Sequence, residues 1–298
     1  MSKKTNVAVL GLMGNSVFMS VPHFHSAGET VSAESIYTEP GGKGCNQAVA
    51  AARLGAEVSF ISCMGEDATA KECIAFMDKE GIACFTEYTA LASSPLACIL
   101  TDSGGENRVT VYRGSADHLT ESFVCSCEDA ISKADILLLN NECPLSANTA
   151  ALELAEKHGV KAILNPAPYM PLPQSYLRRF YLITPNLHEA RMLAGTNANA
   201  SPQTAVERLR ELGVRRGAIT LGGDGAIAWD GDELYSCEAE LVIAKDTTGA
   251  GDCFSGALAV SLAANADIRA AVRFAVRCAG LSVTRSHVMT ALPYLKEL

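Results

Sequence analysis

Two aspartates flank a glycine-rich turn in residues 246–257, which read Asp-Thr-Thr-Gly-Ala-Gly-Asp-Cys-Phe-Ser-Gly-Ala. A run of small residues follows the turn and predicts a helix. Successive backbone N–H groups of residues 249–251 at the helix start would bind an anion such as a phosphoryl group in transfer. Asp252 could accept the proton of an attacking hydroxyl, and Asp246 could hold a second hydroxyl. The structural alternative makes Asp246 a helix cap and Asp252 a favourable first-turn charge.

A second glycine-rich segment, residues 41–47, reads Gly-Gly-Lys-Gly-Cys-Asn-Gln and precedes a helix-like run of alanine and valine. Its glycines allow the backbone to approach a ligand closely, and the helix start offers free N–H groups. Lys43 adds a cation, and Asn46 adds an amide that both donates and accepts, a mixture that suits a polyhydroxy ligand. The P-loop pattern Gly-x-x-x-x-Gly-Lys-Ser/Thr is absent from the sequence. A tight structural turn is the alternative to a ligand site in this segment.

Alternating strand-like and helix-like segments must position these turns. Buried strands are predicted at residues 7–10, 58–63, 136–140, 162–165, 181–184 and 218–221. Helices are predicted at residues 46–54, 69–79, 147–158, 187–193 and 204–212, and further along at 250–264 and 268–282. Antiparallel strands are predicted at residues 225–230 and 233–239. The alternation predicts a parallel sheet covered on both faces, with ligands at the C-terminal ends of its strands.

Two stretches, residues 21–40 and 84–113, carry short alternating β-branched segments and no good helix pattern. They predict antiparallel ribbons. We expect them to form a small sheet, made of about residues 14–40 and 84–113, that lies as a lid over the active-site edge. An exposed small sheet needs cover for its free face or edge, which a partner subunit or a bound substrate would supply.

Composition excludes several classes of protein. The chain has 298 residues, 48% hydrophobic and 19% charged, which is typical of a globular domain rather than a disordered chain. Its net charge of −9 gives no general attraction for nucleic acid or anionic membranes, so neither is expected as a partner. The sequence shows no long apolar run and no secretion signal, and we expect a cytoplasmic protein. Its 11 cysteines are scattered, without a Cys-x-x-Cys pair, which argues against a disulfide framework or a zinc site.

Taken together, the two glycine-rich segments resemble the signatures of the ribokinase-like, or PfkB-type, carbohydrate kinases. The resemblance covers nearly the whole chain, because further landmarks match in order. These landmarks are Gly28-Glu29-Thr30, Asn165-Pro166-Ala167-Pro168, Thr184-Pro185-Asn186-x-x-Glu189, Thr220-Leu221-Gly222-x-x-Gly225 and Val283-Thr284-Arg285.

This resemblance implies a fold, an activity and partners. The fold would be a three-layer α/β/α domain over residues 1–298, with a mostly parallel central sheet and a small β-sheet lid. The activity would be ATP-dependent phosphorylation of a hydroxyl on a small sugar, a pentose or a hexose. Mg²⁺ would assist, and many members of the family also bind a monovalent cation such as K⁺. A homodimer formed through the lid is expected from the same resemblance.

The resemblance also assigns roles to residues. Asp252 would deprotonate the acceptor hydroxyl, and the phosphoryl group would be stabilised by Gly249, Ala250 and Gly251. The positions that would contact the sugar are Gly14, Ser16, Gly42, Lys43, Asn46, Glu142 and Asp246. The nucleotide side would comprise Asn186, Glu189, Thr220, Gly222 and Gly225, of which the first two organise Mg²⁺ and phosphate through water. The monovalent cation would involve Asp246, Thr248 and backbone carbonyls around Val283, Ser286 and Val288.

Three positions depart from the family pattern. Gly14 and Ser16 stand where such proteins usually carry an Asn and an Asp that grip sugar hydroxyls. A serine can hydrogen-bond a hydroxyl but lacks the strength that a carboxylate charge adds. The space opened by Gly14 could admit a bulkier or differently substituted substrate. His287 stands where glycine is common, and we expect a surface loop residue there rather than a nucleotide contact.

Two other functions stay open at the level of sequence. A nucleoside kinase of the same family would need an apolar platform for the base, which Phe18, Phe24 and Tyr112 could supply. A catalytically silent sugar-binding protein is suggested by the altered Ser16, whereas the intact Asp252 and its glycines argue against it.

Overall fold

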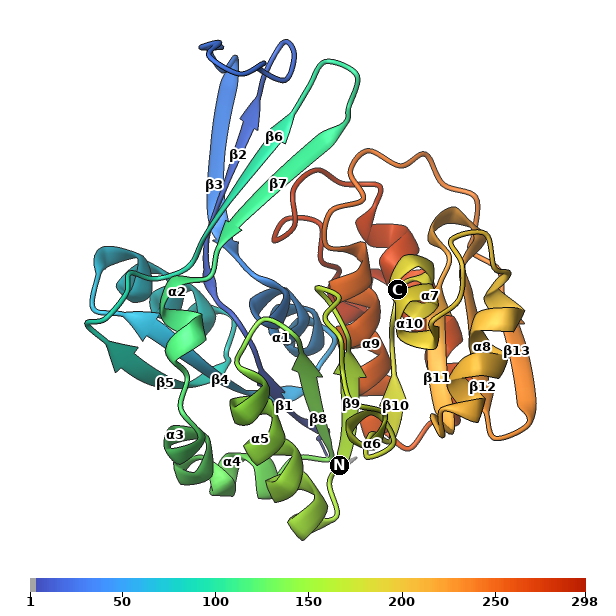
Figure 1. Cartoon of the computed structure of the whole chain (residues 1–298). Helices are drawn as coiled ribbons and strands as arrows, with labels where there is room; N and C mark the ends of the chain where they lie inside the picture. The colour runs from blue at the N-terminus through green and yellow to red at the C-terminus, as the bar shows by residue number, and fades with distance from the viewer. Residues whose placement is uncertain (1–3) are drawn as a thin grey trace.

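A nine-stranded sheet crosses the centre of the computed structural model, which describes residues 4–298 (Figure 1). Its strand order is β13-β12-β11-β10-β9-β8-β1-β4-β5. The strands are β1 (Asn6–Leu10), β4 (Glu57–Gly65), β5 (Ala83–Thr89), β8 (Ile136–Asn140), β9 (Lys161–Asn165), β10 (Leu182–Ile183), β11 (Arg216–Thr220), β12 (Ala226–Asp230) and β13 (Glu233–Cys237). Pairing is parallel from β5 to β11 and antiparallel at β12 and β13. The predicted parallel sheet with an antiparallel end is therefore confirmed.

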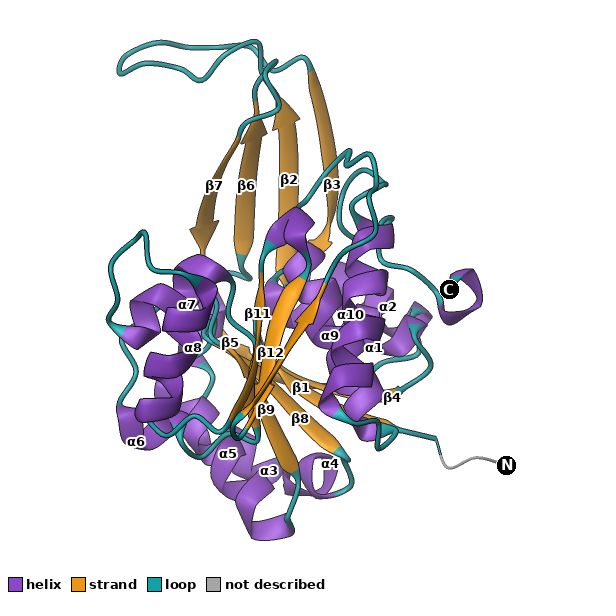
Figure 2. Cartoon of the chain, turned by 90° about the vertical axis from the view of Figure 1, so that its right-hand side faces the viewer, coloured by secondary structure: helices purple, strands orange, loops and turns teal. Residues whose placement is uncertain are grey.

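Helices cover both faces of this sheet (Figure 2). One face packs against α1 (Lys43–Arg53), α2 (Ala68–Lys79), α9 (Ala250–Ala263) and α10 (Ile268–Ser282). The other packs against α3 (Glu121–Ser126), α4 (Glu128–Ser132), α5 (Leu145–His158), α6 (Gln174–Leu177), α7 (Leu187–Ala194) and α8 (Pro202–Glu211). Strand β1 contributes side chains to the hydrophobic core on each face of the sheet. Val7 and Val9 lie in the core beneath α1 and α9, and Ala8 and Leu10 lie in the core beneath α5. Alternating side chains on one buried strand thus hold three layers together.

Polar residues set the helix ends locally. Side chains of Asp67, Ser201 and Asp267 accept backbone N–H groups at the starts of α2, α8 and α10. Gly159 and Gly195 end α5 and α7 in the left-handed conformation. Within residues 4–298, none of the helices combines the length and the apolar character that a membrane span requires.

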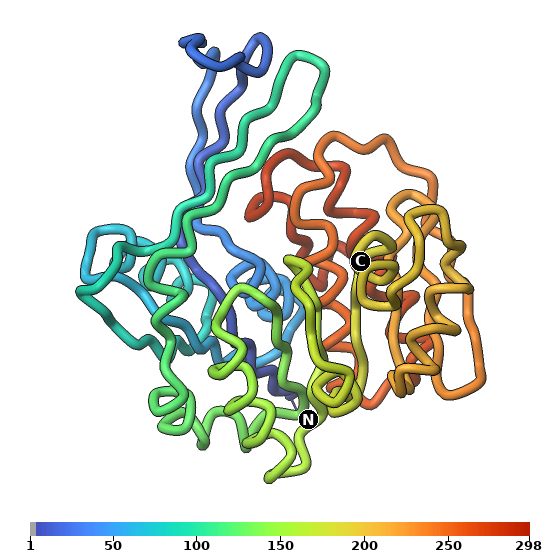
Figure 3. Tube along the Cα trace, viewed as in Figure 1, coloured from blue at the N-terminus to red at the C-terminus, as the bar shows by residue number. Residues whose placement is uncertain are grey.

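A smaller four-stranded sheet projects from one end of the body, and we call it the lid (Figure 3). Its strands are β2 (Gly14–Ser20), β3 (Ser35–Gly41), β6 (Leu96–Thr101) and β7 (Asn107–Tyr112), in the order β3-β2-β6-β7. The two outer pairs are antiparallel, as in the predicted ribbons, but the central pair of β2 and β6 is parallel. Both of these strands leave the body in the same direction, since each follows a strand of the large sheet.

The second predicted ribbon starts too early in the sequence. Residues 83–89 form β5, which pairs in parallel with β4 at the edge of the large sheet. The connection between the two strands is α2, a helical crossover of the kind that parallel pairing requires. Cys84 packs against the core beneath α2, which holds the segment in the body. The second arm of the lid therefore begins at β6.

Candidate active site

Asp252 lies in the first turn of α9, and its buried carboxylate is held by two side chains of α1. The Nδ2 of Asn46 donates to Oδ2 at 2.8 Å, and the Nε2 of Gln47 donates to Oδ1 at 3.1 Å. Two hydrogen bonds from α1 fix the direction of this α9 carboxylate, as a catalytic base requires. The two glycine-rich segments, about 200 residues apart in sequence, therefore meet at Asp252, as these contacts show.

Gln47 is a site residue that the sequence did not single out. Its Nε2 also donates to Oδ1 of Asn165 at 3.0 Å, and its Oε1 lies 3.4 Å from Nδ2 of Asn140. Asn165 in turn donates to the carbonyl of Thr184 at 2.7 Å. Gln47 is completely buried at the head of a helix whose next residues are apolar, so its amide ties Asp252 to the ends of β8 and β9. The available signal was a second polar residue, next to Asn46, directly before that apolar run.

The turn before α9 presents backbone N–H groups beside the Asp252 carboxylate. Gly249 is the N-cap residue with φ of 78°, a left-handed conformation that favours glycine. The first helical hydrogen bond runs from Cys253 N–H to the Gly249 carbonyl. Within residues 4–298, the N–H groups of Gly251 and Asp252 have no backbone acceptor, as expected in a first helical turn. The Ala250 N–H, also predicted to be free, instead donates to the Thr247 carbonyl at 3.2 Å.

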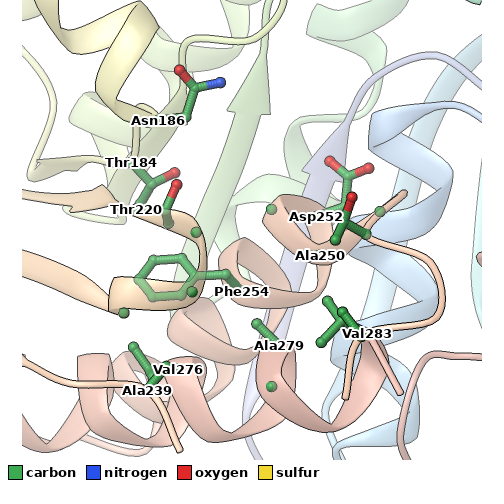
Figure 4. A pocket seen from close by; sticks show the side chains of 18 of the residues that line it. Thr184, Asn186, Thr220, Ala239, Ala250, Asp252, Phe254, Val276, Ala279 and Val283 are labelled. Carbon is green, nitrogen blue, oxygen red and sulfur yellow. The ribbon is translucent and has the colours of Figure 1, made fainter. Parts of the chain in front are cut away.

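A cavity of about 520 Å³ joins this turn to the predicted nucleotide positions (Figure 4). Its polar end is lined by Lys43, Thr184, Asn186, Glu189, Thr220, Gly249, Ala250, Gly251 and Asp252. Its apolar end is lined by Ala239, Val242, Phe254, Val276, Ala279 and Val283. Gly222 and Gly225, in the turn after β11, also line the cavity. This volume suits a ligand with an apolar ring at one end and an anionic group at the other.

Asn186 and Glu189 begin α7 and close a capping box. The Asn186 side chain accepts the Glu189 N–H at 2.8 Å, and Glu189 accepts the Asn186 N–H at 2.9 Å. Burial raises the pKa of the Glu189 carboxyl, and the positive charge of Lys43 opposes that rise. An isolated bridge places Asn186 beside Thr220. The oxygen atoms of Asn186 and Glu189 are hard ligands that fit a hydrated Mg²⁺.

Of the predicted sugar contacts, Gly42, Lys43, Asn46 and Glu142 lie at or against the start of α1, whereas Asp246 instead accepts the N–H groups of Thr248 and His287. Burial raises the pKa of Glu142 to about 7, and its Oε2 accepts the Gly44 N–H at 3.2 Å. The negative charge of Asp252 is the main cause that raises the pKa of Lys43. The Oδ1 of Asn46 is buried and has no hydrogen-bond partner within residues 4–298. Acidic, basic and amide groups thus converge beside the Asp252 carboxylate.

Gly42 shapes this side of the site through its backbone. Its φ of 102° is a conformation that side chains rarely adopt, and a Cβ there would lie 2.5 Å from Cδ2 of Leu12. The glycine lets the start of α1 approach the end of β1 closely enough for Lys43 and Asn46 to reach Asp252.

The expected space at Gly14 does not exist. A Cβ at Gly14 would lie 2.1 Å from the carbonyl oxygen of Pro95, so the lid hinge already fills that volume. Ser16 is buried, and its Oγ would lie 2.1 Å from a Cβ placed on Gly41. The lid side of the sugar site is therefore neither enlarged by Gly14 nor supplied with a carboxylate by Ser16.

The predicted monovalent-cation positions lie together but do not form a cage. Asp246 accepts N–H groups of Thr248 at 2.9 Å and His287 at 3.0 Å. The carbonyls of Val283 and Val288 each already accept two backbone N–H groups, and each carbonyl oxygen has only two lone pairs. The Ser286 carbonyl accepts the Thr290 hydroxyl. These carbonyls do not fit a cation in this arrangement.

His287 is not the surface residue that the sequence led us to expect. It is half-buried with φ of 64°, and its ring stacks on Tyr37 with centroids 3.9 Å apart. Phe18 meets the same ring edge-on at 5.5 Å. The lid therefore touches the segment after α10 through an aromatic contact.

The aromatic platform imagined for a nucleoside base is not assembled. Through the β6 ladder, Phe18 lies on the same lid face as Val109, whereas Tyr112, three positions further along β7, points to the other face. Phe24 lies in the loop at the lid tip, under the Arg108 guanidinium at 4.1 Å. These three aromatic rings do not converge on one site.

Fold and site together define a class of enzyme. A carboxylate of α9 that α1 holds in place lies beside free backbone N–H groups at a helix start, at one end of a cavity of about 520 Å³, with Asn46 and Glu142 close by. That arrangement is suited to phosphoryl transfer onto an alcohol.

The chain belongs to the pfkB family carbohydrate kinases, whose model matches residues 4–295. It is 35% identical to a ribokinase from Haemophilus influenzae, over 99% of this chain and 97% of that protein. The structure of Arabidopsis thaliana ribokinase complexed with ribose and ATP superposes with a TM-score of 0.90 at 27% identity, covering 99% of this chain and 97% of that one. Thermotoga maritima ribokinase superposes with a TM-score of 0.89 at 31% identity, covering 98% and 97%. The protein is an ATP-dependent sugar kinase that transfers phosphate to a hydroxyl.

Proposed function

We propose that the protein phosphorylates a pentose of the ribose type, with Asp252 as the general base. The observation that carries this proposal is the Asp252 carboxylate, which is held by Asn46 and Gln47 between the nucleotide cavity and the sugar-side residues. A hydroxyl bound beside Asn46 would give up its proton to Asp252 as it attacks the phosphoryl group. A correctly placed carboxylate contributes about 10²–10⁴-fold to such a step.

The remaining site residues divide the work of positioning and charge stabilisation. The free N–H groups of Gly251 and Asp252 would hydrogen-bond the phosphoryl oxygens as negative charge develops there. Lys43, which lines the cavity beside Asp252, would add a cation to the same space. Asn186 and Glu189 would hold Mg²⁺ through water, and the ion would neutralise phosphate charge. Gly222 and Gly225 would leave room for the nucleotide above the ends of β10 and β11.

Two observations favour a pentose over a larger sugar. Relatives named ribokinase and deoxyribokinase match over nearly the whole chain, and the Arabidopsis structure holds ribose with ATP. The Pro95 carbonyl fills the space that Gly14 would otherwise give to a bulkier substrate. Ser16 would offer one hydroxyl to the sugar, which is a weaker contact than a carboxylate.

We also propose that the protein is a homodimer joined through the lid. One face of the lid exposes the apolar side chains of Ile36, Leu96 and Tyr112. Exposed apolar side chains gathered on a small sheet mark an association surface, and unpaired outer strands strengthen that expectation. Light scattering at micromolar concentration should give twice the mass of one chain. The mass of a single chain would contradict the dimer.

A substrate panel tests the proposed reaction. ADP release should be measured with D-ribose, 2-deoxy-D-ribose, D-arabinose, D-fructose and adenosine at fixed ATP and Mg²⁺. We expect turnover with D-ribose or another pentose, and none above background with adenosine. Turnover with fructose or adenosine alone would overturn the pentose assignment. If none of these compounds supports ADP release above background, the proposal is contradicted.

A further inference from the structure

Two carboxylates from different parts of the fold bind three consecutive N–H groups in residues 287–289, which we call the 287–289 segment. The His287 N–H donates to Asp246 at 3.0 Å. The next two donate to Glu39: Val288 N–H to Oε1 at 2.8 Å and Met289 N–H to Oε2 at 3.1 Å. Asp246 precedes the phosphoryl-binding turn, whereas Glu39 lies on lid strand β3. The lid and the catalytic turn are therefore tied to the same short segment.

Glu39 occupies a position where a carboxylate needs a specific reason. Only 5% of its surface is exposed, and its two backbone contacts bridge 249 and 250 residues of sequence. A buried carboxylate is costly unless donors compensate it, and the two N–H groups supply that compensation. Glu39 is the direct cross-strand partner of Ser16. An aspartate at position 16 would face Glu39 across the ladder, where like charges repel.

Val288, whose N–H group binds Glu39, also packs against the phosphoryl-binding turn. A Cβ at Gly249 would lie 2.6 Å from Cγ1 of Val288, so the valine packs directly on that glycine. Gly249 begins α9, and the free N–H groups of Gly251 and Asp252 follow it. Packed interiors transmit displacement because they hold few voids. A shift of Val288 would therefore move the N–H groups that face the cavity.

The lid makes a second contact with the same segment. The His287 ring stacks on Tyr37 of β3, and Phe18 of β2 lies against its edge. The stack fixes the position of β3 relative to the segment, while Glu39 fixes the backbone N–H groups. The segment thus has one hydrogen-bonded and one aromatic attachment to the lid, and one hydrogen bond to the turn side through Asp246.

We propose that Glu39 is a positioning residue that couples the seating of the lid to the assembly of the phosphoryl-binding N–H groups. When β3 is seated, Glu39 holds Val288 against Gly249 and the turn takes its reactive geometry. When β3 lifts, the two N–H groups lose their acceptor and Val288 is released from the glycine. This role rests on the proposed function, and it would restrict phosphoryl transfer to the state in which β3 is seated.

The test compares Glu39→Gln with Glu34→Gln, an exposed lid glutamate that serves as the matched control. Glutamine keeps the shape of Glu39 but turns an N–H₂ group towards one of the two backbone donors. For Glu39→Gln with D-ribose we expect kcat to fall by about tenfold or more, as a displaced oxyanion donor would predict. The dissociation constant of D-ribose, measured by calorimetry, should stay within about threefold. Amide hydrogen exchange should accelerate in residues 287–289 and 249–252.

Three outcomes decide the proposal. A loss of kcat with faster exchange in residues 249–252, absent in Glu34→Gln, supports it. A lower melting temperature with unchanged kcat per folded molecule and unchanged exchange in residues 249–252 overturns it, because Glu39 would then be structural only. If the wild-type enzyme phosphorylates no panel sugar, the proposed function fails and the exchange experiment alone decides the coupling.

A second variant keeps the proposal open to refutation if Glu39→Gln does not fold. Val288→Ala leaves both backbone N–H groups in place and removes only the side chain that packs on Gly249. We expect it to lower kcat several-fold while D-ribose affinity stays within about threefold. A Val288→Ala enzyme with wild-type kcat and wild-type exchange in residues 249–252 would contradict the coupling.

Discussion

The body side and the lid side of the active site are built in different ways. On the body side, Asp252 receives two side-chain hydrogen bonds from α1, and Gln47 links it to the ends of β8 and β9. On the lid side, Ser16 offers a single hydroxyl, and the Glu39 carboxylate beside it is bound to the backbone of the 287–289 segment. The catalytic carboxylate is thus fixed by rigid helices, whereas the lid contributes through its position relative to the 287–289 segment. Substitutions on the body side should lower kcat. Substitutions on the lid side should weaken the coupling between the lid and the phosphoryl-binding turn and should reduce selectivity among sugars.

The largest effect is expected where the two sides touch, at Gly249. Gly249→Ala would force a side chain into the left-handed region and against Val288, at 2.6 Å from its Cγ1. We expect kcat to fall about 10²-fold or more, because the N–H groups after it would be displaced. The matched change is Gly159→Ala, at a left-handed glycine outside the site whose Cβ would meet nothing within 4 Å, and it should cost much less in kcat. Steady-state ADP release measures both, and equal losses would show that the Val288 contact is unimportant.

Removal of the Gln47 amide probes the rigidity of the body side. Gln47→Ala would leave the Oδ1 of Asp252 and the Oδ1 of Asn165 each without its buried donor, at a cost of about 1–3 kcal/mol in the free energy of unfolding. We expect kcat to fall about tenfold, since the carboxylate could then rotate. Gln203→Ala, at an exposed position in α8, is the control for both measurements. Wild-type kcat in Gln47→Ala would show that Asn46 alone orients Asp252.

The sequence predicted the body side well and the lid side poorly, for a physical reason. Runs such as Ile136–Asn140 are apolar on both faces, which indicates a buried parallel strand without knowledge of its neighbours. Asn46 and Asp252 lie in local glycine-rich patterns, and each pattern predicts the start of a helix. The role of Glu39, by contrast, depends on a contact across 249 residues of sequence. The parallel pairing of β2 with β6 and the filling of Gly14 by Pro95 likewise follow from how distant segments return to the hinge.

The pH dependence of stability should report on the buried Glu142. Its pKa is raised to about 7 in the folded protein, against 4.5 as the reference for the unfolded chain. Between these values the folded state binds more protons, so the free energy of unfolding should decrease as pH rises from about 5 to 7. Glu142→Gln should reduce this decrease in the free energy of unfolding by an amount on the order of 1–3 kcal/mol. Urea unfolding of both proteins across that range measures it, and parallel curves would refute the raised pKa.

The smallest predicted effect concerns the Ser16 and Glu39 pair on the lid. Ser16→Asp would place two carboxylates opposite each other in the β2–β3 ladder. We expect a coupling of about 0.5–1 kcal/mol in the free energy of unfolding, visible as a smaller cost of Ser16→Asp when Glu39→Gln is also present. A double-mutant cycle by urea unfolding measures it. Additive effects would show that Glu39 does not account for the serine at position 16.

Asp252→Asn tests most directly whether this carboxylate removes the proton from the acceptor hydroxyl. Asparagine keeps the size of the side chain and removes the basic oxygen that the hydroxyl proton would reach. Single-turnover phosphorylation of D-ribose, at saturating ATP and sugar, should slow by about 10²-fold or more while calorimetry shows sugar binding within a few-fold of wild type. A variant that phosphorylates D-ribose at close to the wild-type rate would contradict the assignment of Asp252 as the base.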